Sequence, residues 1–131
     1  MTEHGAAITV VAAVIERDRR FLLTRRLEGT HLAGCWEFPG GKCDPGESHR
    51  DCLVRELREE LNVTVEVGRL VMSTAHAYAD RSVALYFYEG FTDEEPQPQL
   101  GQAIRWAARE ELTSLEFPEA DAALIETLAH G

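Results

Sequence analysis

Three glutamates lie close enough together in the sequence to bind a metal ion. Glu56, Glu59 and Glu60 are spaced i, i+3 and i+4, so on a helix their carboxylates share one face. Like charges at that spacing cost a helix roughly a few tenths of a kcal/mol per pair, so stability alone would favour a lysine there. Glu47 precedes them, beside a glycine-rich stretch that contains Gly41. This pattern suits a hard divalent cation with oxygen ligands, although a solvated charged helix face explains the glutamates equally well when they are taken alone.

A helix is predicted over residues 48–61, where it would carry these glutamates. Ser48 is an N-cap residue, and Asp51 stands three positions later, as in a capping box. Asn62 follows the predicted helix and suits a left-handed C-cap. An apolar stripe with i, i+4 spacing would face the core, and it consists of Leu53, Leu57 and Leu61.

The remaining patterns predict strands on both sides of this helix. The almost entirely apolar run 7–16 is typical of a strand buried on both faces. Pro39-Gly40-Gly41 and Pro45-Gly46 indicate a long loop before the helix. Further strands are predicted at 21–25, 63–67, 70–77, 83–91 and 103–107, with a short segment at 36–38, a helical turn at 109–112 and a closing helix at 119–128. One α/β domain spanning residues 1–131 is expected, a sandwich of helices around a central mixed sheet.

Charge and composition exclude several classes of function. The chain has a net charge of −10, from 23 acidic and 13 basic residues, so it is poorly suited to binding the backbone of long nucleic acids. A divalent cation would be needed between its carboxylates and an anionic phosphate. No apolar run is long enough for a membrane span, and the first residues lack a signal-peptide pattern, so a cytoplasmic location is expected. Cys35, Cys43 and Cys52 are expected to be free thiols.

A family resemblance joins these observations. Gly41, Glu47 and the run 55–63 (RELREELNV) resemble the Nudix box, G-x5-E-x7-R-E-U-x-E-E-x-G-U with U apolar. The one departure is Asn62, which stands where the family has glycine and which also tolerates a left-handed conformation. Segment 36–42 (WEFPGGK) is similar to the stretch before the box in MutT-like enzymes of the nucleotide pool. Weaker similarities to that group lie at 24–26, 80–81 and 117–121.

The resemblance implies the Nudix fold and hydrolysis of nucleoside diphosphate derivatives with Mg²⁺ or Mn²⁺. By position in the motif, Glu56, Glu60 and the carbonyl of Gly40 would be metal ligands. Glu59 would be a third ligand or the base that activates water. Two further residues, Glu47 and Arg55, would orient the helix carboxylates.

One glutamate of the MutT-like pattern is missing from this chain. It lies six residues before the tryptophan of the penultimate strand, and here that position is Leu100. Either the carboxylate is lost, or Glu94 or Glu95 takes its place. We expect Glu59 to act as the base.

The same group suggests which residues bind the substrate: Arg26, Phe38, Arg81 and Asp121 at the base, and Lys42 at a phosphate. An ionised aspartate only accepts hydrogen bonds, so Asp121 favours a base edge that donates, such as an exocyclic amine. The short chain and the WEFPGGK segment favour a nucleoside triphosphate, either an oxidised one such as 8-oxo-dGTP or a (d)CTP-like compound, which would be cleaved to monophosphate and pyrophosphate. The alternatives are ADP-ribose, a dinucleoside polyphosphate, and a nucleotide sensor without activity. The protein is expected to act as a monomer or homodimer.

Overall fold

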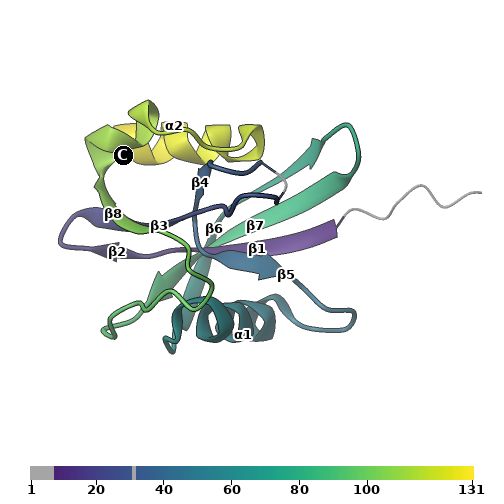
Figure 1. The fold of residues 1–131 in the computed structure, drawn as a ribbon, viewed down its shortest axis with the longest axis horizontal. Coiled ribbons are helices and arrows are strands. Elements are labelled where there is room, and N and C mark those ends of the chain that lie inside the picture. Colours follow the sequence, from purple (N-terminus) through teal and green to yellow (C-terminus); the bar gives the residue numbers. More distant parts are fainter. Residues whose placement is uncertain (1–7, 31) are drawn as a thin grey trace, which may run out of the picture.

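The computed structural model describes residues 8–30 and 32–131, and it arranges them in layers (Figure 1). Helix α1 (His49–Leu61) lies on one side of the strands and α2 (Ala122–His130) on the other. This confirms the predicted α/β sandwich. None of the helices in the described part of the chain has the length and apolar character needed to cross a membrane.

The central sheet is mixed. Its four strands are ordered β5 (Gly40–Lys42), β1 (Ile8–Val14), β7 (Ser82–Phe91) and β6 (Glu66–Ala77). Strand β1 runs parallel to β7 and antiparallel to β5, whereas β6 and β7 form an antiparallel hairpin. The apolar run predicted as a buried strand is β1, which lies between two other strands because its backbone groups need partners on both sides.

A second sheet, which the sequence patterns did not predict, is entirely antiparallel. Strand β3 (Arg20–Arg25) pairs with β2 (Glu16–Arg17), β4 (Trp36–Glu37) and β8 (Ile104–Ala108). Residues 109–114 and 119–121 form 3₁₀ turns, η1 and η2.

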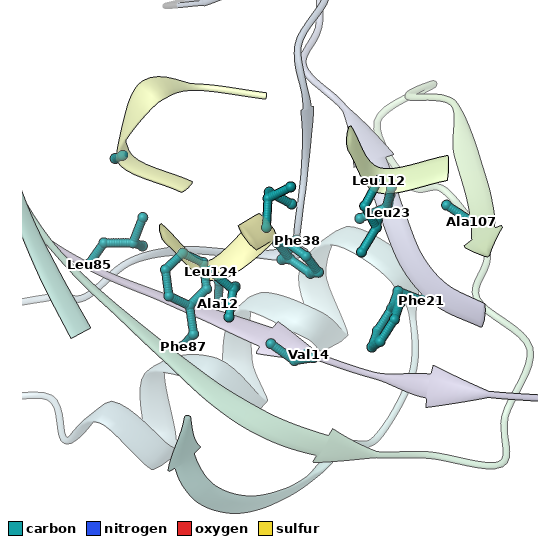
Figure 2. Packing of buried hydrophobic residues seen from close by; sticks show 12 residues of the cluster. Ala12, Val14, Phe21, Leu23, Phe38, Leu85, Phe87, Ala107, Leu112 and Leu124 are labelled. Atoms are coloured by element: carbon teal, nitrogen blue, oxygen red, sulfur yellow. The ribbon is translucent and has the colours of Figure 1, made fainter. Parts of the chain in front are cut away.

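The buried side chains form two clusters. One cluster lies between the central sheet and α2 and includes Phe21, Phe38, Phe87 and Leu124 (Figure 2). The other lies under α1 and contains the predicted stripe of Leu53, Leu57 and Leu61, each 0% exposed. The stripe anchors α1 against the core and so fixes how the helix is rotated about its own axis.

Two predicted boundaries are wrong for identifiable reasons. Gly40 and Gly41 belong to strand β5 rather than to a loop, because their missing side chains let β5 lie close to β1: a Cβ at Gly40 would come within 2.0 Å of the Val11 carbonyl oxygen. Residues 66–77 form one strand, not two, because register shifts near Leu70 absorb the interruption in its apolar pattern.

The closing helix also differs from the prediction. It begins with the 3₁₀ turn η2 after Pro118, whose carbonyl accepts a hydrogen bond from the Asp121 amide at 3.0 Å. Regular α-helix starts only at Ala122 and continues to His130.

Candidate functional site

Helix α1 has the predicted caps at both ends. The Ser48 hydroxyl accepts a hydrogen bond from the Asp51 amide at 3.1 Å. Asn62 adopts the left-handed conformation with φ 55° and ψ 40°, and its amide donates to the Arg58 carbonyl. The caps satisfy backbone groups that the helix itself leaves without partners, so they fix where the helix starts and ends. Asn62, which replaces the glycine of the Nudix box, therefore adopts the left-handed backbone conformation that a glycine at this position would provide.

Two of the three helix glutamates line a cleft of about 390 Å³. Glu56 and Glu60, one helical turn apart, face into it. Glu59 is on the outer side of the same turn: its side chain is 58% exposed, and it accepts a hydrogen bond from Arg55 at 3.1 Å. The i, i+4 pair thus shares the cleft, while the residue between them faces water.

Strand β5 and α1 form what we call the acidic side of the cleft, made of Gly40–Lys42, Glu56 and Glu60. A Cβ at Gly41 would lie 2.3 Å from the Glu56 carboxylate carbon, so no larger residue fits without moving that side chain. Glycine at the first position of the box therefore makes room for the helix carboxylate against the strand.

Arg55 connects the glutamates with the loop before the helix. Its guanidinium donates to Glu47 at 2.8 and 2.9 Å, and to Glu56 and Glu59 at 3.1 Å each. It also donates to the Lys42 carbonyl at 3.2 Å. The hydrogen bonds from Arg55 and from the Asp44 amide lower the pKa of Glu47 to about 2. Glu47 thus fixes the position of the Arg55 guanidinium, and this guanidinium in turn holds the Glu56 carboxylate by a hydrogen bond.

The other part of the cleft, which we call the aromatic side, is assembled from distant segments. It contains Phe38, Tyr78, Arg81 and Asp121 above an apolar floor. Phe38 is only 3% exposed, and it packs against Phe87 and Phe117 with ring centroids 6.0 and 5.8 Å apart. The floor is formed by Val83, Leu85 and Phe87 of β7. A flat apolar group would find contact on this side of the cleft.

Buried acidic groups run from one side of the cleft to the other. Burial raises the pKa of Glu60 to about 8, and the charges of Glu37 and Glu56 act in the same direction. Burial, with a contribution from Glu37, raises the pKa of Asp121 to about 7, although the Arg26 guanidinium opposes the rise. Arg26 pairs with Glu37 at 2.8 Å. The described lining thus combines four acidic side chains, each with a raised pKa, with three cationic ones, Arg26, Lys42 and Arg81.

The donor set of the acidic side fits a hard cation. It offers two carboxylates, from Glu56 and Glu60, beside the backbone of Gly40. Within residues 8–30 and 32–131, no three His, Cys, Asp or Glu side chains are arranged around one point as ligands. A magnesium ion needs no such group, because it is commonly bound through one or two carboxylates, with waters and substrate phosphates completing the shell.

The structure brings most of the predicted site residues to this one cleft. Its lining includes Arg26, Phe38, Gly40, Lys42, Glu56, Glu60, Arg81 and Asp121. Arg55 and Glu47 lie behind it. Glu37 and Tyr78 also line the cleft, although neither is among the predicted site residues. The signal for Glu37 was its place in the WEFPGGK segment, two residues before the proline.

The structure also locates the candidates for the missing glutamate. Leu100 is 57% exposed and, together with Glu60 and Glu37, borders a smaller hollow of about 160 Å³ next to the cleft. Glu94 accepts a hydrogen bond from the Thr64 amide at 2.7 Å, and Glu95 pairs with Arg17 at 2.8 Å. Both glutamates are thus engaged away from the cleft, and neither is among the described residues that line it.

Comparisons with known proteins agree with this geometry. The family model for the NUDIX domain matches residues 10–127. The CTP pyrophosphohydrolase of Escherichia coli (strain K12) is 41% identical over 120 residues, which covers 91% of this chain and 89% of that protein. An 8-oxo-dGTP diphosphatase of Haemophilus influenzae is 35% identical and covers 92% and 90%. The crystal structure of a MutT protein from Methanosarcina mazei Go1 superposes with a TM-score of 0.85 at 25% identity, covering 98% of this chain and 97% of that one.

Proposed function

This chain belongs to the Nudix hydrolase family, and on that premise we propose that it cleaves a nucleoside triphosphate to the monophosphate and pyrophosphate. The family assignment makes it an enzyme that acts on phosphoanhydride bonds. The observation that carries the proposal is the single cleft, in which two helix carboxylates lie on one side and an apolar floor with Asp121 lies on the other. Such a cleft suits a ligand with a polyphosphate at one end and a flat base at the other.

Hydrolases of this family generally need a divalent metal, and we propose Mg²⁺ or Mn²⁺ here. Glu56, Glu60 and the Gly40 carbonyl would hold it. When bound, such an ion offsets the charge between the carboxylates and the polyphosphate, and it lowers the pKa of water. Without it, the Glu56 and Glu60 carboxylates would repel the polyphosphate.

The protein's own groups then bind and orient the triphosphate. Lys42 lines the acidic side and can donate to a phosphate oxygen. Arg55, held by Glu47, keeps the Glu56 carboxylate in place against Gly41. Water adds to the α- or the β-phosphorus while the bridging P–O bond between these two atoms breaks. The pyrophosphate leaves in the first case and the nucleoside monophosphate in the second, and a carboxylate receives the proton that the water loses.

Glu59 remains the proposed base or third ligand. Its exposed carboxylate must exchange its bond to Arg55 for a position nearer the cleft before it can act. An E59Q variant should therefore lose most of its turnover, and near wild-type turnover would show that another group takes the proton.

The aromatic side favours a base whose edge both donates and accepts hydrogen bonds. With its pKa raised to about 7, Asp121 is partly protonated near neutral pH, so its carboxyl can donate through one oxygen and accept through the other. The amino group and adjacent ring nitrogen of cytosine match that pair, as they do in adenine. Arg26, Phe38 and Arg81 complete the proposed contacts. We therefore place a (d)CTP-like compound ahead of 8-oxo-dGTP; the relatives' names include both substrates.

A hydrolysis panel tests this proposal. CTP, dCTP, 8-oxo-dGTP, the unmodified purine triphosphates, ADP-ribose and a dinucleoside polyphosphate would each be incubated with the enzyme and Mg²⁺, and the products separated by ion-exchange chromatography. We expect monophosphate and pyrophosphate from a cytidine triphosphate at the highest kcat/KM. Preferential cleavage of ADP-ribose or the dinucleotide would overturn the substrate class, and binding without cleavage of any compound would indicate a sensor.

Three further expectations belong to the same proposal. The ligand is a small nucleotide rather than a long nucleic acid, because the net charge is −10. The protein acts in the cytoplasm, as a monomer or homodimer.

A further inference from the structure

Gln102 is one of only a few buried polar side chains in the described part of the chain, at 7% exposed. Its amide nitrogen donates to the Glu60 carbonyl at 3.1 Å, and its amide oxygen accepts from the Leu100 backbone at 2.9 Å. Both polar ends of the side chain are therefore used, which is what a buried amide requires. One of these bonds reaches the last turn of the helix that carries the proposed metal ligands.

The segment 97–102 supplies partners that the end of α1 lacks. The last carbonyls of a helix receive no hydrogen bond from an amide of the same helix. Here the Gln97 amide donates to the Leu61 carbonyl at 2.8 Å, and the Gln99 amide donates to the Glu60 carbonyl at 2.9 Å. Gln102 adds a second donor to the same Glu60 carbonyl, and it is the only one of the three to do so through its side chain.

The Glu56 and Glu60 side chains differ in their hydrogen bonding. Glu56 is held directly by Arg55 at 3.1 Å. For the Glu60 carboxylate, by contrast, residues 8–30 and 32–131 provide no hydrogen bond, so its place in the cleft follows from the position of its backbone. The two cleft carboxylates are thus fixed in different ways, one through its side chain and the other through its carbonyl.

We infer that Gln102 is a positioning residue for Glu60: it holds the last turn of α1 so that this carboxylate stays within reach of a divalent cation shared with Glu56. The inference rests on the proposed function for its metal but not for its substrate. It also gives segment 97–102 a role in positioning the end of α1, and this role does not need the glutamate that Leu100 replaces.

The test compares two methionine variants. Q102M keeps the length and apolar packing of the side chain and removes both hydrogen bonds. Q99M is the matched control, since Gln99 is exposed and its bond to Glu60 comes from the backbone, which the substitution leaves in place. Q99M removes only the side-chain hydrogen bond from Gln99 to the Gln97 carbonyl at 2.8 Å, which does not involve α1. Binding of Mn²⁺ alone to each folded protein would be followed by electron paramagnetic resonance, and kcat and KM would be measured on CTP.

We expect Q102M to bind Mn²⁺ roughly tenfold more weakly and to lose a similar factor in kcat with little change in KM, as the loss of a residue that supports a metal ligand does. Q99M should match the wild type in both. A folded Q102M with wild-type Mn²⁺ affinity would overturn the inference, as would an equal loss in both variants. Should Q102M not fold, Q102N takes its place, because its shorter amide fails to reach Glu60 while remaining polar, and the same outcomes apply. If no triphosphate is cleaved but Mn²⁺ binding falls in Q102M alone, the proposed substrate fails and the positioning role stands.

Discussion

The two sides of the cleft are built in different ways. The acidic side comes from one continuous stretch, in which strand β5, a loop and helix α1 place Gly40–Lys42 beside Glu56 and Glu60. The aromatic side is gathered from Phe38, the β6–β7 hairpin with Tyr78 and Arg81, and the turn η2 with Asp121.

Under the proposed function, this difference would separate the chemistry from the choice of substrate. The acidic side depends on short-range geometry: a helix repeat, two caps and a glycine that leaves room for a carboxylate. The aromatic side depends on how distant segments pack around Phe38 and Phe87. A change on the acidic side should therefore abolish cleavage of every substrate, whereas a change on the aromatic side should alter which substrate is preferred.

The largest effect is expected from Glu56→Gln. The change keeps the size of the side chain but removes the negative charge that a divalent ion needs, so kcat should fall by more than about 100-fold on every nucleotide, since losing even an outer partner of a ligand costs about 10–100-fold. The measurement is steady-state hydrolysis on CTP and 8-oxo-dGTP. E126Q, at an exposed glutamate of α2, is the control. A loss on only one of the two nucleotides would contradict the separation of the two sides.

A somewhat smaller effect is expected from Arg55→Met. The variant loses the hydrogen bonds to Glu47, Glu56 and Glu59, and kcat should fall by roughly 10–100-fold. The comparison is R58M, whose guanidinium contacts the Thr64 hydroxyl outside the cleft and whose kcat should stay near that of the wild type. If both arginine variants lose the same factor, general helix stability rather than the Arg55 contacts explains the loss.

On the aromatic side, Asp121→Asn should change preference rather than abolish cleavage. An amide offers one donor and one acceptor at every pH, whereas a carboxyl with a pKa of about 7 is mostly ionised at pH 8 and then only accepts. At pH 8 the ratio of kcat/KM for CTP to that for 8-oxo-dGTP should therefore be about tenfold higher in D121N than in the wild type. The ratio is measured by direct competition of the two nucleotides. An unchanged ratio would mean that Asp121 does not contact the base.

The same substitution should also change how the free energy of unfolding depends on pH. Burial raises the pKa of Asp121 from 3.8 to about 7, so the unfolded chain loses this proton at a lower pH than the folded one. Stability should therefore be unaffected by this group below about pH 4, decrease as pH rises toward 7, and stay reduced above it. At pH 8, D121N should be more stable than the wild type by about 1 kcal/mol or more in urea unfolding, and the two should converge near pH 4. Parallel curves across this range would contradict the shift.

The acidic side could be predicted from the sequence almost completely. Ser48, Asn62 and the leucine stripe define α1, and the helix repeat then orients Glu56 and Glu60. Two expectations failed there. Glu59 does not share the cleft with Glu56 and Glu60. Gly40 and Gly41 resembled a loop, because only pairing with β1 reveals why small residues are required.

The aromatic side could be suggested only by family resemblance. Nothing local in Tyr78 or Glu37 indicates that the hairpin and β4 bring them to the same cleft as Asp121. The second sheet was missed for the same reason, since the pairing of β3 with β8 joins segments about 80 residues apart. The periodicity of apolar residues indicates which face of a helix or strand is buried, but it does not indicate which other element packs or pairs with it.

The central claim is that Glu56 and Glu60 together hold the divalent ion on which cleavage depends. Titration of Mn²⁺ into the wild type and E60Q without nucleotide, followed by electron paramagnetic resonance, tests it most directly. We predict saturable binding to the wild type and binding at least about tenfold weaker to E60Q. Equal binding to the two proteins, with E60Q shown to be folded, would contradict the account.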